Sequence, residues 1–160
     1  QSKLMAMIHY EDLEVGATSK FGRYDVIREE VIEFAQKYDP QPFHLDDEAA
    51  AKTHFGRLSA SGWHTCAMTM AMLVENMKTS RQAGLGSPGM DNLRWVKPVF
   101  PGDTLRVETT IVEKRRSKNR PDMGLFKSDV TIFNQDDEPV MTMRSNGLIK
   151  VRNPEAPIEE

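Results

Sequence analysis

Residues Gly62–Lys78 read GWHTCAMTMAMLVENMK and are the strongest indication of how the chain folds. Few of its positions are polar, and the first charged side chain after Gly62 is Glu75. A helix that is apolar on all sides is a buried helix. Small or flexible residues such as Ala and Met suit a helix that is packed from several directions. The sequence therefore predicts a buried central helix around which the other elements are arranged.

Two shorter helices are expected before this central one. The first covers residues 28–38, where apolar side chains recur with the i, i+3, i+4, i+7 spacing of an amphipathic helix, at Val31, Phe34, Ala35 and Tyr38. It ends at Asp39 because a residue that precedes proline is biased away from helical backbone angles. A second helix follows Asp46-Asp47, which resemble an N-cap, and extends to Lys52.

The chain changes period after Gly89 and becomes rich in Val, Ile, Thr and Phe in partial alternation. Strands are expected at residues 92–99, 104–114, 125–133 and 139–151, with a further strand at 17–27 before the helices. Turn signals separate the later strands. The predicted class is α+β, an antiparallel sheet wrapped around the central helix. Such a sheet keeps an exposed face and exposed edges, which favours a homodimer.

Composition limits the class of protein. The 160 residues carry 21 basic and 24 acidic side chains, a net charge of −3, which argues against a domain-wide nucleic-acid surface. No apolar stretch approaches the ~20 residues of a membrane helix. The single cysteine, Cys66, permits no internal disulfide, so we expect a cytoplasmic protein. The spacing of His44, His54 and His64 matches no zinc site, so we expect no metal. We expect a leader over 1–9, one domain over 10–152 and a flexible tail over 153–160.

The loop Tyr38-Asp39-Pro40-Gln41-Pro42-Phe43-His44-Leu45-Asp46 holds the most unusual combination of residues. Two prolines stiffen it, while Asp39 and His44 project a carboxylate and an imidazole. Such a pair can hold one water, with one group removing a proton and the other supplying one. The alternative is structural, because Asp before Pro initiates turns and a loop histidine often faces solvent. The residues leave open which of the two would be the base.

Ser61 and Gly62 stand at the start of the central helix. The first amides of a helix lack internal acceptors and lie at its positive end. Glycine allows another group to approach the backbone closely. The Gly62 amide could therefore stabilise negative charge on a substrate oxygen, as in an oxyanion hole. The alternative is that Ser61 is an ordinary N-cap and Gly62 a packing residue.

Five basic residues lie between positions 114 and 120. This run is most simply a solvated hairpin tip between two strands. Arg115, Arg116 and Lys118 could instead contact the phosphate groups of an anionic ligand. A role in nucleic-acid binding is a weaker alternative, because no stacking aromatics accompany the charges.

The sequence resembles the MaoC-like dehydratases, relatives of the (R)-specific enoyl-CoA hydratases, over about residues 10–150. The matching motifs are Phe34-Ala35, the whole loop from Tyr38 to Asp46, Ala49, Phe55-Gly56, Ala60-Ser61-Gly62, Pro98-Val99 and Pro101-Gly102-Asp103-Thr104-Leu105. The family commonly has Asn where this chain has Gln41, and often His where it has Ser61. Both differences lie outside the acid–base pair and bear on acyl preference more than on the reaction.

The resemblance implies the hotdog fold, a long helix wrapped by a curved antiparallel sheet, usually as a dimer. It also implies reversible addition of water to a trans-2-enoyl-CoA, with Asp39 and His44 as the catalytic pair and Gly62 donating its amide to the thioester oxygen. Coenzyme A enters as part of the substrate, and no cofactor is expected. A hotdog thioesterase and a non-catalytic acyl-binding module are the alternatives.

Overall fold

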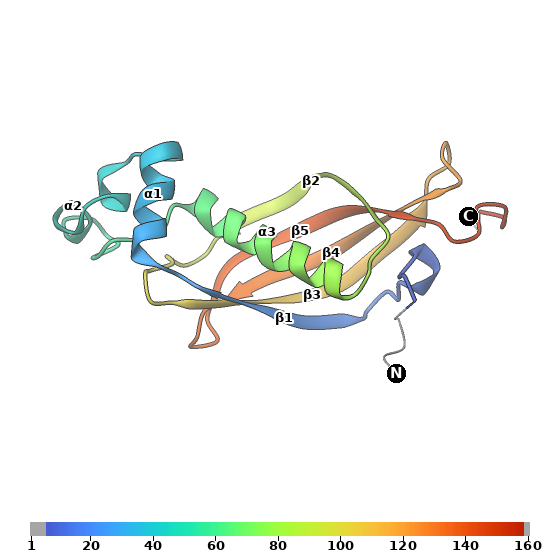
Figure 1. Cartoon of the computed structure of the whole chain (residues 1–160), viewed down its shortest axis with the longest axis horizontal. Coiled ribbons are helices and arrows are strands. Elements are labelled where there is room, and N and C mark those ends of the chain that lie inside the picture. Colours follow the sequence, from blue (N-terminus) through green and yellow to red (C-terminus); the bar gives the residue numbers. More distant parts are fainter. Residues whose placement is uncertain (1–5, 159–160) are drawn as a thin grey trace.

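The computed structural model describes residues 6–158 and has one antiparallel sheet with a long helix across one of its faces (Figure 1). The five strands follow the order β1-β3-β4-β5-β2. In sequence order the elements are η1 (Tyr10–Asp12), β1 (Thr18–Asp25), α1 (Arg28–Tyr38), η2 (Pro42–His44), α2 (Asp47–Ala51), α3 (Gly62–Thr79), β2 (Gly84–Trp95), β3 (Thr104–Arg116), β4 (Met123–Phe133) and β5 (Pro139–Lys150).

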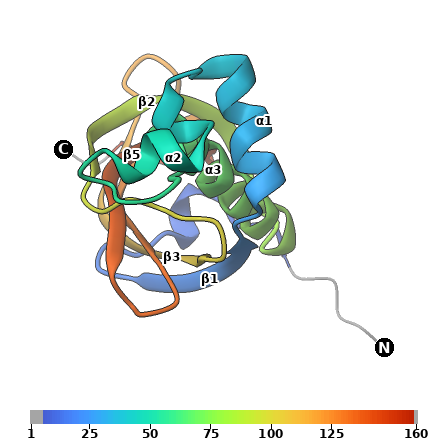
Figure 2. The same cartoon turned by 90° about the vertical axis from the view of Figure 1, so that its left-hand side faces the viewer.

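The α+β hotdog architecture is confirmed. Seen along the length of the molecule, the sheet curves around α3 (Figure 2). The helices α1 and α2 lie together at one end, and the hairpin that joins β3 to β4 lies at the other end (Figure 1). The predicted bounds of α1 are confirmed, and those of α2 and α3 differ from the prediction by one residue at an end. Asp46 caps α2 by accepting a bond from the Ala49 amide.

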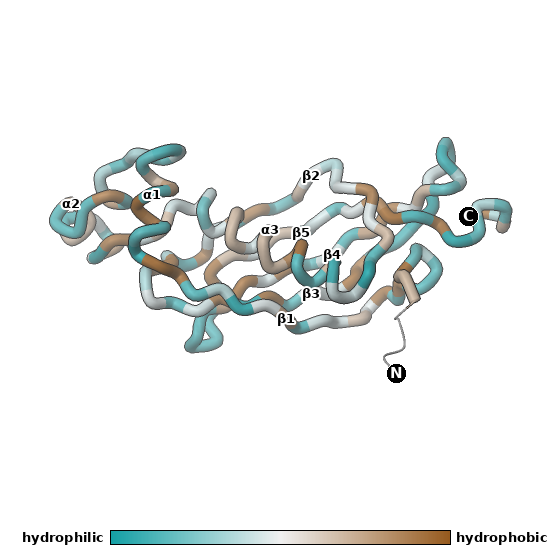
Figure 3. Tube along the Cα trace, in the orientation of Figure 1, coloured by the Kyte–Doolittle hydropathy of each residue, from teal (hydrophilic) through white to brown (hydrophobic). Residues whose placement is uncertain are grey.

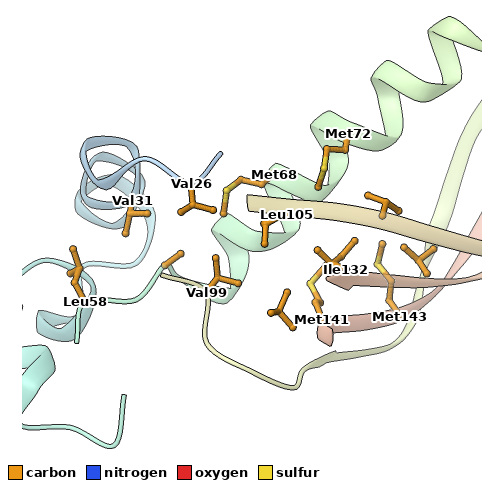
Figure 4. Packing of buried hydrophobic residues seen from close by; sticks show 14 of the residues in the cluster. Val26, Val31, Leu58, Met68, Met72, Val99, Leu105, Ile132, Met141 and Met143 are labelled. Atoms are coloured by element: carbon orange, nitrogen blue, oxygen red, sulfur yellow. The ribbon is translucent and has the colours of Figure 1, made fainter. Parts of the chain in front are cut away.

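The core is the layer between α3 and the inner face of the sheet. Met68 and Met72 of α3 project toward β3, β4 and β5, where Leu105, Ile132 and Met141 are fully buried (Figure 4). Burial of each such side chain contributes roughly 1.5–3 kcal/mol. The turns that join β3 to β4 and β4 to β5 lie outside this core and are hydrophilic (Figure 3).

One glycine in β1 permits this close packing. Gly22 has a φ of +88° and lies where the pairing of β1 with β3 shifts register, between Phe21 and Tyr24. A Cβ at this position would approach the Met72 sulfur to 2.8 Å. Glycine therefore supplies both the left-handed backbone and the space for the methionine.

Two expectations are corrected. The central helix is not enclosed on all sides, because Trp63 and Met70 are exposed: one curved sheet can cover only one side of a helix. The second strand occupies 84–95 rather than 92–99. Its glycine-rich first half lacks strand-forming residues, but pairing with β5 from Gly84 to Trp95 holds it in the sheet, with register shifts at the glycines.

Near both ends of the described residues 6–158, the chain contacts the rest of the domain. Ile8 pairs with Gln82 and exchanges backbone hydrogen bonds with Arg81 and Ala83. At the other end, the Arg116 guanidinium donates to the carbonyls of Pro154 and Ala156. Within residues 6–158, no helix is both long enough and apolar enough to cross a membrane.

Candidate active site

Asp39 and His44 meet at the end of the molecule that carries α1 and α2. The amide of Asp39 bonds to Ala35 and closes α1, and the two prolines then turn the chain into η2, which ends at His44. This short path brings His44 Nε2 to 3.6 Å from Asp39 Oδ2. The side chains are 7% and 18% exposed, so the pair is largely withdrawn from solvent.

The orientation of His44 is determined by its second ring nitrogen. Nδ1 lies 2.7 Å from the backbone carbonyl of Ser59. A carbonyl only accepts, so Nδ1 carries a hydrogen and donates it to Ser59, which leaves Nε2 as the ring nitrogen that faces Asp39. The ring of Phe43 packs edge-on against the imidazole at 4.5 Å and limits its rotation.

Asp39 is held by two side-chain donors. Ser61 Oγ donates to Oδ2 at 2.7 Å, and Gln41 Nε2 donates to Oδ1 at 2.7 Å. Burial opposes ionisation of the carboxyl, but these two hydrogen bonds and the nearby His44 together lower the pKa of Asp39 below its ordinary value. The group is therefore a carboxylate at neutral pH, aligned on the imidazole.

Ser61 is not an ordinary N-cap. It occupies the N-cap position of α3 but makes no side-chain capping bond, because its hydroxyl is bonded to Asp39. Gly62 follows it as the first residue of the helix. The structure thus brings together the four residues of the expected catalytic and oxyanion sites, namely Asp39, His44, Ser61 and Gly62. The sequence did not predict the hydrogen bond between Ser61 and Asp39, because the two residues are 22 positions apart and belong to separate motifs.

The basic run lies elsewhere. Arg115, Arg116 and Lys118 belong to the β3–β4 hairpin, at the end of the molecule opposite α1 and α2 (Figure 1). At about 3.3 Å per strand residue, Arg116 is roughly 35–40 Å from Thr104, where β3 begins beside β1. Arg116 is also engaged by the backbone of the C-terminal tail. Within one chain, the run therefore does not join the site at Asp39.

A cavity of about 1060 Å³ adjoins this distant hairpin and is lined in part by Arg115, Arg116 and Lys118. A second cavity of about 330 Å³ lies between α1 and α3. The smaller one is lined by a polar group that sequence reasoning missed, formed by Tyr24, Glu30 and His64. Glu30 accepts from the Tyr24 hydroxyl and lies 3.4 Å from His64 Nε2, while Phe34 stacks on the imidazole at 4.7 Å. This group ties β1, α1 and the first turn of α3 together.

His64 should make stability depend on pH. Burial lowers the pKa of its imidazole below the ordinary 6.5 despite the opposing effect of Glu30. The unfolded chain therefore takes up the proton first as the pH falls, so the free energy of unfolding should decrease below about pH 6.5. Urea unfolding between pH 5 and 8 measures this slope. His64→Gln should flatten it and the exposed His54→Gln should not; equal slopes in both variants would contradict the assignment.

Within residues 6–158, no three His, Cys, Asp or Glu side chains cluster in a way that could hold a metal ion. Burial raises the pKa of the Cys66 thiol, which disfavours the reactive thiolate form.

The chain is similar to known proteins over most of its length. A MaoC-like dehydratase from Rhodospirillum rubrum is 38% identical, with a TM-score of 0.83 over 91% of this chain and 98% of its own. The R-hydratase PhaJ1 of Pseudomonas aeruginosa is 25% identical, with a TM-score of 0.65 over 96% of each chain. The 3-hydroxybutyryl-CoA dehydratase of Methylorubrum extorquens is 31% identical over 111 residues, 68% of this chain and 67% of the relative. The family model of the MaoC like domain matches residues 12–130, so the chain belongs to the MaoC-like dehydratase family.

Proposed function

We propose that this protein is a hydro-lyase that adds water reversibly to a trans-2-enoyl-CoA, giving a 3-hydroxyacyl-CoA. The observation that carries the proposal is the pairing of the partly buried Asp39 with the buried His44 beside the start of α3. Two similar proteins support it, one a dehydratase of 3-hydroxybutyryl-CoA and the other an R-hydratase.

The reaction needs three contributions, and the site has a group for each. A water held between the Asp39 carboxylate and His44 Nε2 adds its oxygen to C3 of the enoyl group. One proton of that water passes to the pair, and a proton from the pair reaches C2, so the pair ends as it began. The thioester oxygen carries negative charge in between, and the Gly62 amide at the positive end of α3 stabilises it.

The test is an assay of purified protein with enoyl-CoAs of graded chain length, including branched and dicarboxylic ones. Hydration removes the conjugated absorbance of the enoyl thioester and releases no thiol. A thioesterase would instead release the free thiol of coenzyme A from a saturated acyl-CoA. If no substrate loses its enoyl absorbance and none releases thiol, while acyl-CoA still binds, the protein is a non-catalytic binding module and the proposal is rejected.

We further propose that the working unit is a homodimer formed through β2 and the open face of α3. Apolar side chains are exposed along both elements, namely Trp63, Met70, Leu85, Met90, Trp95 and Val96. β2 is an edge strand, and nearly all its residues face solvent in one chain. The other edge, β1, carries exposed charges at Lys20 and Arg23, which oppose strand pairing. β2 also exposes Asp91 and Arg94, but the large exposed apolar side chains lie along this apolar edge and along α3, so a second copy fits here rather than at β1.

A lysine on the apolar edge should therefore separate the subunits. We expect the protein to sediment at twice the 18.2 kDa mass of the chain, and Met90→Lys to shift it toward the monomer, because a charge would be buried in the interface. Ser19→Lys, the matched change on β1, should leave the mass unchanged. A monomeric parent protein, or equal dissociation of both variants, would contradict this interface.

A further inference from the structure

The side of Gly62 that faces β2 is covered by the indole of Trp95. Trp95 is the last residue of β2, and its Nε1 donates to the Gly62 carbonyl at 2.9 Å. A Cβ built on Gly62 would lie 2.7 Å from Cδ2 and 2.8 Å from Nε1 of the ring, closer than side chains pack. The backbone of Gly62 is outside the left-handed region that calls for glycine. The ring, rather than the backbone angles, therefore explains why no side chain is tolerated here.

The first turn of α3 needs support from outside the helix. Glycine has the greatest backbone freedom of any residue, so a helix that begins with it frays readily. A capping serine would normally bind the first amides. Here the hydroxyl of Ser61 is bonded to Asp39 and makes no cap. The hydrogen bond from Trp95 to the Gly62 carbonyl supplies this support, and it acts on the residue whose amide faces the proposed thioester site.

We propose that Trp95 is a positioning residue that keeps the Gly62 amide directed at the thioester oxygen; this inference rests on the proposed function. The indole N–H fixes the peptide on the carbonyl side of Gly62, and the ring blocks rotation of its α-carbon toward β2. The remaining freedom of the amide is small. This precision matters because a donor stabilises an oxyanion at about 2.7–3.1 Å, and a displacement of about 1 Å can cost a factor of 10² in rate.

The neighbouring tryptophan provides a matched control. Trp63 contacts Trp95 edge-on, with ring centroids 5.3 Å apart and planes at 80°. Both rings belong to the same exposed face, with Trp63 59% and Trp95 46% exposed. The described bond to Gly62 comes from Trp95. If Trp95 contributed only apolar surface, for example to the dimer, substitution of Trp95 and of Trp63 would change activity equally.

The test compares Trp95→Phe, which keeps an aromatic ring but removes the N–H, with Trp63→Phe. We expect Trp95→Phe to lower kcat for enoyl-CoA hydration about 10-fold to 100-fold, with a change in KM below about 3-fold. Trp63→Phe should stay within about 3-fold of the parent in both. Subunit mass and Tm are measured alongside. An unchanged kcat in Trp95→Phe, an effect on KM alone, or an equal fall in Trp63→Phe would overturn the inference.

A binding measurement separates this inference from the proposed function. The probes are a saturated acyl-CoA and its thioether analogue, in which a methylene replaces the thioester carbonyl. The parent protein should bind the thioester more tightly, and Trp95→Phe should lose most of that preference, while Trp63→Phe keeps it. A parent protein that shows the preference but hydrates no enoyl-CoA would reject the proposed function and leave the positioning role supported. No preference in the parent would overturn the positioning role itself.

Discussion

Asp39→Asn should lower kcat for enoyl-CoA hydration by about 10²–10⁴, with little change in the fold. Asparagine has nearly the same shape and can still accept the hydrogen bond from Ser61, but it carries no charge and takes up no proton. A steady-state assay on purified protein, with circular dichroism to check folding, measures the effect.

The matched control is Asp46→Asn in the same loop. Asp46 caps α2 through the Ala49 amide, and asparagine caps a helix about as well, so activity should stay within about 2-fold. Full activity in Asp39→Asn, or an equal loss in Asp46→Asn, would show that Asp39 takes no part in the reaction.

Since the pKa of Asp39 is lowered, its carboxylate persists as the pH falls to below 3.8, the ordinary value for the group.

His44→Asn should reduce kcat by a similar factor, about 10²–10⁴. The asparagine amide nitrogen can replace Nδ1 as the donor to the Ser59 carbonyl, so the local anchor survives while Nε2 is lost. The change therefore removes the nitrogen that faces Asp39 and little else. The same steady-state assay measures the effect. The control is His54→Asn, because His54 is an exposed histidine after α2.

The double variant adds a sharper criterion. Two groups that act on one water fail together, so Asp39→Asn with His44→Asn should be scarcely slower than either single variant. Losses that multiplied would mean that the two residues serve separate steps and would reject the shared-water arrangement.

The loop that carries Asp39 and His44 and the central helix were predictable from sequence, because each depends on neighbours in the chain. The prolines that stiffen the loop, the carboxylate and the imidazole lie within six residues, and the apolar run of α3 is continuous. The first half of β2 was missed for the opposite reason. Its glycines have no strand preference, and only pairing with β5, about sixty residues away, holds them extended.

The contacts that complete the site are likewise distant in sequence. Ser61 reaches Asp39 from 22 residues away, and Trp95 reaches Gly62 from 33. Local patterns predict that Ser61 caps the helix, which is the usual role of serine at this position. Here the partly buried carboxylate of Asp39 binds the hydroxyl instead, and this contact is visible only in the folded structure. A tryptophan ending a strand gives no local sign that its partner is a helix start.

The edge-on pair of Trp63 and Trp95 makes the protein its own optical probe. The chain has two tryptophans, and both are in this pair. Its entire indole emission therefore originates beside the first turn of α3, on the face through which we expect the subunits to associate. Association should shift the emission to shorter wavelength as water leaves the rings, and acyl-CoA binding at Gly62 should change its intensity. One unlabelled fluorescence titration can thus follow both events.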